Sequence, residues 1–443
     1  MSEQPNLAPM AQAPSKAGSI SLVAAAALGV GGMMGAGLYT LLGLAVRSTG
    51  VLLPLAFAVA GAAAALSVYS YSRLGATFPS SGGAAEFLVR SFGDGVVAGG
   101  LNVFQYVGYL IATSLYAAGF AEYVGALAGD SMPTWGSKAV GAAVVLVFTG
   151  VNLLSPSLVG RAATLIVGIE SVILVGFVLL GLFHADPSRL TSQGMPGALG
   201  VVTGAALLYV TYQGFGVVAN AAGRMRNPAK DLPRAMYAAL AVVITVYLVV
   251  STLVVTLVPL PVMEQDAGHV LADAGRSVAG HVGFVVVATA AILATASAVN
   301  ATIFAAASIG QDVARKREVS PLLARDVLGG KPVALLVSAA AVVVLVLFFP
   351  LNAVGQMTSL AFLVIYGAVS LGHLRLRSQT RAAAWPLWAA VVVNAALFLA
   401  LLVDAVRTGP ATTWITLVGA LIGSFVFEAW FRQRRRPSTP TTD

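Results

Sequence analysis

Long apolar runs separated by short polar loops dominate the sequence. A helix needs roughly 20 consecutive apolar residues to cross a bilayer core of about 30 Å. Runs of this kind recur along the whole chain, with approximate bounds 19–46, 51–72, 94–127, 134–154, 162–183, 199–222, 234–258, 280–311, 332–350, 353–374, 384–403 and 411–431. The pattern predicts an all-α membrane protein of about twelve transmembrane helices.

Composition favours the same class. Of the 443 residues, 58% are hydrophobic and only 9% are charged, whereas an ordinary soluble domain is roughly a quarter charged. The net charge of +8 does not indicate a nucleic-acid partner, because the basic residues lie in short loops rather than on one soluble face. The lipid bilayer is the partner that the composition predicts, and the sequence does not identify protein partners.

Residues for cofactor or metal chemistry are sparse. Cysteine is absent, which excludes disulfides and thiolate ligands. His184, His269, His281 and His373 are widely scattered and show no ligand spacing. We therefore expect no cofactor and no metal.

Lys and Arg are unevenly distributed between the two sides of this map. Twenty of the 25 fall on one side, and the other side holds Arg47, Lys138, Arg189, Arg276 and Arg407. Cytoplasmic loops carry the excess of basic residues in membrane proteins. We therefore expect a multi-pass protein of the cytoplasmic membrane with both termini in the cytoplasm.

The membrane domain is expected to span residues 19–431 as one unit. Residues 1–18 are polar and rich in Pro and Ala, and they lack the basic start and short apolar segment of a signal peptide. They are expected to form a cytoplasmic N-terminal tail, and residues 432–443 a cytoplasmic C-terminal tail.

Glycines interrupt two of the predicted helices near their midpoints. The first run reads GVGGMMGAGLY over residues 29–39, and the sixth reads YVTYQGFG over residues 209–216. Each glycine weakens a helix by about 1 kcal/mol relative to alanine, and free backbone groups are tolerated in a bilayer only where they line a protein-enclosed cavity. We expect unwound segments at Gly35–Gly37 and Gln213–Gly216 that face each other.

Interrupted helices at matching positions of two halves are typical of transporters built on inverted repeats. The repeats would span about 19–183 and 199–374, with two appended helices over about 384–431. For the first interruption an alternative stays open, in which Gly31 and Gly35 form a GxxxG face for close helix packing.

Four segments resemble motifs of the amino acid–polyamine–organocation permeases, a family with the five-plus-five inverted-repeat (LeuT-like) fold. They are GVGGMMGAGLY (29–39) in the first helix, LGATFPSSGGAAEFLVRSFG (74–93) after the second, TYQGFGVVANAAGRMRNPAKDLPRAM (211–236) at the sixth and LAFLVIYGAVSLGHLRLR (360–377) in the tenth. The four follow one another in the family's order. The resemblance implies alternating access with broken helices one and six.

The resemblance also implies where an amino acid would bind. Its carboxylate would meet backbone N–H groups of Gly35, Ala36, Gly37 and Leu38, which agrees with the positive end of a half-helix dipole. Its ammonium would meet carbonyls around Gly214, namely those of Val210, Thr211 and Gln213. Phe215 would cover the substrate, the alternative being a packing aromatic.

Some positions depart from the family pattern. Ala36 replaces the commoner Ser or Thr, which removes a hydroxyl but keeps backbone recognition. Gly223 and Arg224 stand where many members carry acidic residues, and Gly216 stands where some carry Asp. These departures make a cationic amino acid a less favoured substrate.

Glu170 is the one ionisable residue near the middle of a predicted span. A charge there costs several kcal/mol unless it is paired or neutralised, so burial favours the protonated form. By resemblance it falls where sodium-independent members often place a lysine. We expect a proton-coupling carboxylate, with Gln105, Tyr106, Ser297 and Asn300 as candidate polar partners; the alternative is a permanently protonated structural group.

The function expected from these observations is secondary active transport of an amino acid, coupled to protons. A polyamine or amine importer and an amino acid exchanger of the same fold remain alternatives. A channel would need rings of charges or carbonyls along a pore, and an intramembrane enzyme would need paired catalytic groups at one depth. The sequence offers a single buried carboxylate, which argues against both.

Overall fold

A computed structural model describes residues 20–80, 82–129, 132–154, 156–192, 197–315, 326–327 and 331–434. The predicted N-terminal tail and most of the predicted C-terminal tail lie outside these residues. So does most of the basic loop between α13 (Val270–Arg315) and α14 (Val333–Phe348).

Helices make up nearly all of the described chain. The remaining longer ones are α1 (Leu22–Met34), α2 (Ala36–Thr49), α3 (Leu53–Thr77), α5 (Val96–Leu127), α6 (Thr134–Leu154), α7 (Pro156–Gly181), α9 (Ala198–Leu208), α11 (Pro228–Leu257), α15 (Leu351–Thr380), α16 (Ala384–Thr408) and α17 (Ala411–Gln433). Shorter elements are η1 (Gly50–Leu52), α4 (Gly83–Phe92), α8 (Arg189–Ser192), η2 (Tyr209–Tyr212), α10 (Phe215–Asn220), η3 (Ala222–Arg224), α12 (Leu260–Gln265) and an antiparallel pair of two-residue strands, β1 (Asp326–Val327) and β2 (Lys331–Pro332).

The expected all-α membrane architecture is confirmed in its broad form. Within the described residues, nine helical stretches are long and apolar enough to cross a membrane. Three shorter apolar helices accompany them, at Leu22–Met34, Leu165–Gly181 and Val333–Phe348. The number of twelve spans and the inverted repeat stay predictions.

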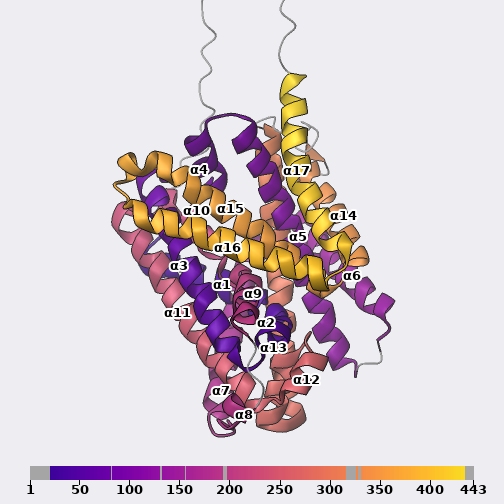
Figure 1. The fold of residues 1–443 in the computed structure, drawn as a ribbon. Helices are drawn as coiled ribbons and strands as arrows, with labels where there is room; N and C mark the ends of the chain where they lie inside the picture. The colour runs from indigo at the N-terminus through magenta and orange to yellow at the C-terminus, as the bar shows by residue number, and fades with distance from the viewer. Residues whose placement is uncertain are drawn as a thin grey trace, which may run out of the picture.

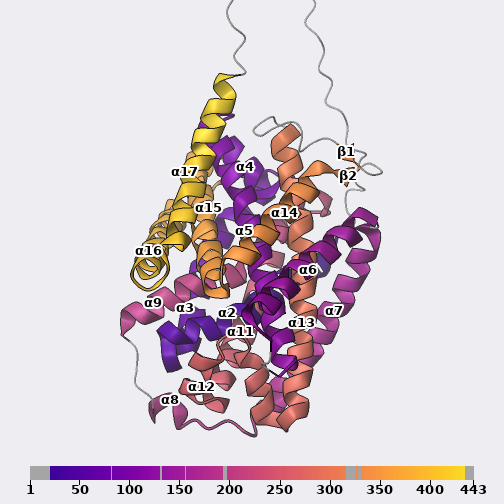
Figure 2. The same ribbon diagram turned by 90° about the vertical axis from the view of Figure 1, so that its right-hand side faces the viewer.

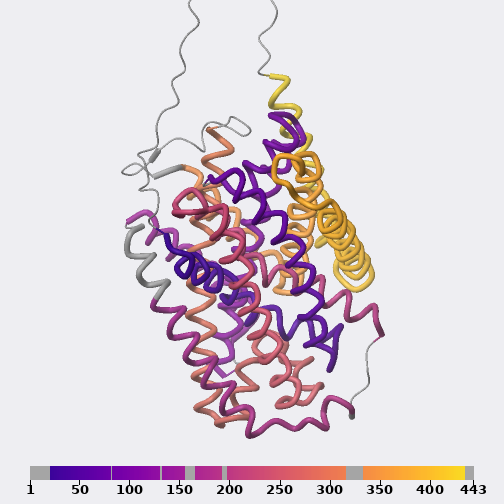
Figure 3. The backbone as a smooth tube through the Cα atoms, turned by 90° about the vertical axis from the view of Figure 1, so that its left-hand side faces the viewer, coloured from indigo at the N-terminus to yellow at the C-terminus, as the bar shows by residue number. Residues whose placement is uncertain are grey.

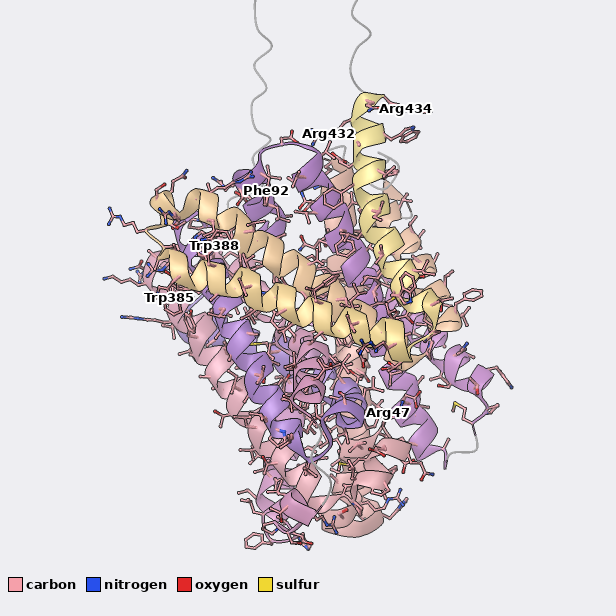
Figure 4. All side chains as sticks on the ribbon, viewed as in Figure 1. Arg47, Phe92, Trp385, Trp388, Arg432 and Arg434 are labelled. Atoms are coloured by element: carbon pink, nitrogen blue, oxygen red, sulfur yellow. The ribbon has the colours of Figure 1, made fainter. Side chains whose placement is uncertain are left out.

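The bundle has two opposite faces (Figure 1). The short helix α4 and the C-terminal end of α17 lie at the upper face, whereas α8 and α12 lie at the lower face. Arg432 and Arg434 mark the upper face, and Arg47 lies well below them (Figure 4). Arg47 is one of the five basic residues on the side with fewer Lys and Arg, and the orientation in the membrane stays a prediction.

Helices α16 and α17 run along one flank of the bundle, and views from opposite sides agree on this (Figures 2 and 3). Large apolar side chains point outward from them, with Trp385 exposed by 72% and Val426 by 62%. Such surfaces are what a lipid environment requires of a spanning helix.

Polar contacts fasten α17 to α5. Glu428 is fully buried, and its Oε1 accepts a bond of 2.5 Å from Arg432, which also bonds to Asp94, two residues before α5 begins. Gly99 makes room for this carboxyl, because a Cβ there would lie 2.4 Å from Glu428 Oε1. The last helix is thus held by a charged cluster at the upper face.

Candidate functional site

The first helix is broken at Gly35. Its ψ of −148° leaves the helical region and divides the helix into α1 and α2. We predicted unwinding over Gly35–Gly37, but Ala36 and Gly37 already belong to α2. Gly37 serves close approach instead, because a Cβ there would lie 3.1 Å from the Cα of Thr211.

The sixth helix is broken too, slightly earlier than predicted. After α9 the chain tightens into the 3₁₀ turn η2 and passes through Gln213 and Gly214 before α10 begins at Phe215. The prediction placed the unwound segment at Gln213–Gly216, whereas Phe215 and Gly216 are helical. The non-α segment is therefore 209–214.

The two breaks lie against each other. A Cβ on Gly214 would lie 2.2 Å from the carbonyl carbon of Gly32 and 2.4 Å from the amide nitrogen of Met33. The nearest atom to a Cβ built on Gly35 would be the carbonyl oxygen of Gly31, at 3.8 Å and in the preceding turn of the same chain segment. The tight packing is therefore made by Gly32, Gly37 and Gly214, and the proposed GxxxG face of Gly31 and Gly35 does not account for the break.

The N-terminus of α2 suits an anion. The first turn carries the N–H groups of Ala36, Gly37 and Leu38, which have no partner within their own helix, and these residues are buried. The N-cap residue Gly35 has no side chain that could accept a hydrogen bond from this turn. Uncapped N–H groups at the positive end of a helix dipole favour a carboxylate.

The backbone carbonyls of the sixth-helix break differ in the number of hydrogen bonds that they already accept. Val210 O accepts from Gln213 N at 3.1 Å, and Gln213 O accepts from Tyr366 Oη at 3.1 Å and from Gly216 N at 3.2 Å. Both lone pairs of the Gln213 carbonyl are thus in use. Of the carbonyls predicted to bind the ammonium, that of Gln213 would have to lose an existing hydrogen bond before it could accept one from the substrate.

The Thr211 carbonyl is the freer one. Tyr247 Oη lies 2.5 Å from Met33 O and 3.2 Å from Thr211 O. A hydroxyl carries one proton, so the shorter contact to Met33 takes it. Thr211 O keeps capacity to accept a bond from an ammonium, and the Tyr247 hydroxyl lies beside both breaks.

Aromatic rings surround the sixth-helix break. Phe215 is 1% exposed, and its ring centroid lies 4.9 Å from that of Tyr366 and 5.2 Å from that of Tyr71. Tyr209 joins the cluster at 5.9 Å from Tyr366. In this conformation the predicted covering residue Phe215 is packed inside the cluster.

Glu170 on α7 lies beside the first break. It is 3% exposed, and its carboxyl interacts electrostatically with the hydroxyls of Tyr39 and Tyr247. In the described structure, neither Glu170 Oε1 nor Tyr39 Oη completes a hydrogen bond of normal geometry. Tyr39 directly follows the predicted carboxylate-binding segment, so the carboxyl and the substrate site are neighbours.

The predicted polar partners have other surroundings. Tyr106 Oη bonds to Ser338 Oγ at 2.9 Å, and Asn300 Oδ1 accepts from Asn152 Nδ2 at 2.7 Å. Gln105 is buried on α5, and Ser297 is half-buried on α13. The interactions found at Glu170 come instead from Tyr39 and Tyr247.

Neither tyrosine was predicted from the sequence as a partner of Glu170. Tyr39 ends the glycine-rich motif and Tyr247 lies in the middle of the seventh predicted span. What could have indicated them is a hydroxyl deep in an apolar run, because a buried hydroxyl needs a hydrogen-bond partner there. A tyrosine also reads as an apolar residue, so periodicity alone did not single it out.

Comparisons with known proteins place this geometry in context. A family model described as amino acid permease matches residues 20–427. An uncharacterized protein of Methanocaldococcus jannaschii is 30% identical over 422 residues, covering 94% of this chain and 95% of the relative. The inner membrane transport protein YbaT of Escherichia coli is 30% identical, covering 80% and 83%. The chloroplastic cationic amino acid transporter 7 of Arabidopsis thaliana is 26% identical, covering 55% and 45%.

Proposed function

Because this chain belongs to the amino acid permease family, we propose that it moves an amino acid across the cytoplasmic membrane by alternating access, with proton coupling at Glu170. The observation that carries the proposal is the contact between the two helix breaks at Gly32 and Gly214. This contact would bring donors and acceptors for the two ends of an amino acid into one buried site.

Backbone groups would recognise the amino acid. The α2 N-terminus at Gly35–Leu38 offers N–H groups to the carboxylate, and Thr211 O offers an acceptor to the ammonium. Backbone recognition is independent of the substrate side chain. The site therefore favours the α-amino acid group as a class over a plain amine, which would leave the N–H donors unpaired.

Alternating access would use the contact that now closes the site. Gly32, Gly37 and Gly214 let the two broken helices approach at backbone distance, and the Tyr247 hydroxyl donates to Met33 O beside this contact. The half-helices α1 and α10 pack together on one side of the breaks, and α2 packs against α9 on the other. Rocking these two pairs would open the site to one face at a time.

Proton coupling would follow from the place of Glu170. A carboxylate in this apolar site is costly, whereas the protonated form can donate to a neighbouring oxygen. Tyr39 and Tyr247 link the carboxyl to α2 and to the Met33–Thr211 pair. Its protonation would therefore alter the same backbone groups that hold the substrate.

Counterflow in proteoliposomes tests the carrier mechanism. Vesicles preloaded with unlabelled L-amino acids should transiently accumulate a mixture of radiolabelled L-amino acids, with saturable kinetics and unmodified label recovered inside. Flux that rises linearly with concentration would indicate a channel instead. Chemically altered label would indicate an enzyme.

A further inference from the structure

A side-chain hydrogen bond joins the sixth-helix break to α5. Gln213 lies in the non-α segment 209–214, and its side-chain Nε2 donates to Tyr116 Oη on α5 at 2.8 Å. The backbone of Gln213 is held in place by the bond that its carbonyl accepts from Tyr366 Oη. The amide side chain therefore extends from a fixed point of the break to α5.

This bond lies next to the first turn of α2. Gly119, one turn after Tyr116 on α5, leaves room for α2, because a Cβ there would clash with Thr40 Cγ2. Thr40 Oγ1 in turn donates to Ala36 O at 2.8 Å, in the first turn of α2. Residues three apart share a face of a helix, so the face of α5 that carries Tyr116 is turned toward α2. Helix α2 also packs against α9 and η2 in the middle of the bundle (Figure 1).

The Gln213–Tyr116 pair holds two groups that have nothing to bond. Gln213 Oε1 is buried, and within the described part of the chain it has no hydrogen-bond partner. Tyr116 is 7% exposed, and because its Oη accepts the bond from Gln213, its own O–H stays available as a donor. Rotating the amide by 180° would exchange the roles and would still leave one donor and one acceptor unpaired. The pair thus presents a donor and an acceptor side by side.

The chemistry of these two groups favours one kind of substrate side chain. A side-chain amide fits both, because its carbonyl can accept from Tyr116 and its NH₂ can donate to Gln213. A hydroxyl also fits, since it has one proton to donate and two lone pairs. An apolar side chain would leave both buried groups unpaired, which is costly. A charged side chain would lose its hydration beside a pair that carries no charge.

We propose that Tyr116 and Gln213 bind the side chain of the transported amino acid, and that the substrates are amino acids with an uncharged polar side chain, an amide or a hydroxyl. The proposal rests on the proposed function, because it takes the α2 N-terminus and Thr211 O as the groups that hold the carboxylate and the ammonium. Those backbone groups hold all amino acids alike, and the pair discriminates among them. Gln213 acts through its side chain, while its carbonyl stays bonded to Tyr366 and Gly216.

Competition between amino acids of matched shape tests this selectivity in the wild-type protein. Proteoliposomes preloaded with unlabelled L-amino acids take up the radiolabelled mixture by counterflow, and single unlabelled amino acids are added outside as inhibitors. Threonine has nearly the shape of valine, and asparagine nearly that of leucine, so each pair differs mainly in hydrogen bonding. Threonine and asparagine should inhibit at concentrations at least about tenfold lower than valine and leucine. Aspartate and lysine should be weak inhibitors as well.

Gln213→Met removes the amide and keeps an unbranched side chain of similar length. In this variant the preference for asparagine over leucine should fall by about fivefold, which is what one neutral hydrogen bond is typically worth. Inhibition by leucine should stay as in wild type. Tyr116→Phe, which removes the hydroxyl and keeps the ring, should lower the preference in the same way. The preference is a ratio measured in one preparation, so a smaller amount of folded protein does not imitate the result.

Gln356→Met is the matched control. In the described structure Gln356 also has a buried Oε1 without a partner, and its Nε2 also donates to a neighbouring helix, namely to Asp404 Oδ2 on α16 at 3.3 Å. It bonds to the flank of the bundle rather than across the break, so this variant should keep the wild-type preference. An equal fall of the preference in Gln356→Met and Gln213→Met would show a general loosening of the bundle, and the proposal would fail.

The outcomes separate this proposal from the proposed function. If wild-type counterflow is saturable but valine and leucine inhibit as well as threonine and asparagine, the carrier mechanism stands and the assigned selectivity is wrong. If Gln213→Met weakens inhibition by asparagine and leucine by the same factor, Gln213 serves the group common to all amino acids, and the assignment is again wrong. If wild-type proteoliposomes show no counterflow, the proposed function and this proposal fail together.

Discussion

A methyl group at Gly214 would have no room, so Gly214→Ala tests whether the contact between the breaks is required for transport. The Cβ would lie 2.2 Å from the carbonyl carbon of Gly32, 2.4 Å from its oxygen and 2.4 Å from Met33 N. These are backbone atoms, so no side-chain rotation can relieve the clash. The two broken helices must separate before the contact becomes ordinary at 3.4 Å or more.

The expected effect is large on transport and moderate on stability. A misplacement of about 1 Å in a site can lower a rate by about 100-fold, and overpacking typically costs about 1–3 kcal/mol. We therefore expect Gly214→Ala to reduce the initial rate of counterflow by about 100-fold and to lower the melting temperature of the purified protein.

Gly216→Ala is the matched control from the same half-helix. Among the described atoms, none lies within 4 Å of a Cβ built there, and alanine favours a helix by about 1 kcal/mol over glycine. This variant should keep wild-type counterflow and melt at or above the wild-type temperature. Wild-type counterflow and stability in Gly214→Ala would refute the requirement for backbone contact between the breaks.

Three further predictions concern the bonds around this site and the appended helix. Tyr247→Phe leaves Met33 O without its 2.5 Å donor and should reduce the free energy of unfolding by about 1–3 kcal/mol in a denaturant titration. Tyr237→Phe is the control, because its hydroxyl makes only a 3.5 Å exposed contact, and it should change the free energy of unfolding little. Equal losses in the two variants would contradict the role assigned to Tyr247. A decarboxylated analogue of the best-transported amino acid should inhibit counterflow at least about tenfold more weakly than the amino acid itself, and equal inhibition would favour an amine importer. Arg432→Gln removes the cation that bonds buried Glu428 and should cost about 1–3 kcal/mol in the same titration, whereas no loss relative to Arg434→Gln would show that the cluster does not hold α17.

The positions of the helix breaks could be read from the sequence to within a few residues. Clustered glycines near the middle of a span weaken a helix wherever they occur, so Gly35 and Gly214 marked the right places. The extents differed because some of the glycines serve close packing. Whether Gly37 unwinds or instead accommodates Thr211 depends on a residue about 170 positions away, which a local pattern does not contain.

The candidate coupling group was found for a similar reason, and its neighbours were missed. A lone carboxyl in an apolar run is costly in any bilayer fold, so Glu170 was visible at once. Tyr39, Tyr123 and Tyr247 contact one another or the breaks only because α2, α5 and α11 meet in space. The hydroxyls of Tyr123 and Tyr247 donate to backbone carbonyls, which no sequence pattern displays.

Uptake driven by an imposed pH difference in Glu170→Gln proteoliposomes tests the central claim most directly. Glutamine has nearly the shape of protonated glutamate, so folding and counterflow should persist while accumulation loses its response to the gradient. Glu86→Gln is the control, because that carboxylate pairs with Arg90 at an exposed site and should leave accumulation as in wild type. If Glu170→Gln still accumulates the label with the wild-type dependence on external pH, Glu170 is a structural group and the coupling mechanism is wrong.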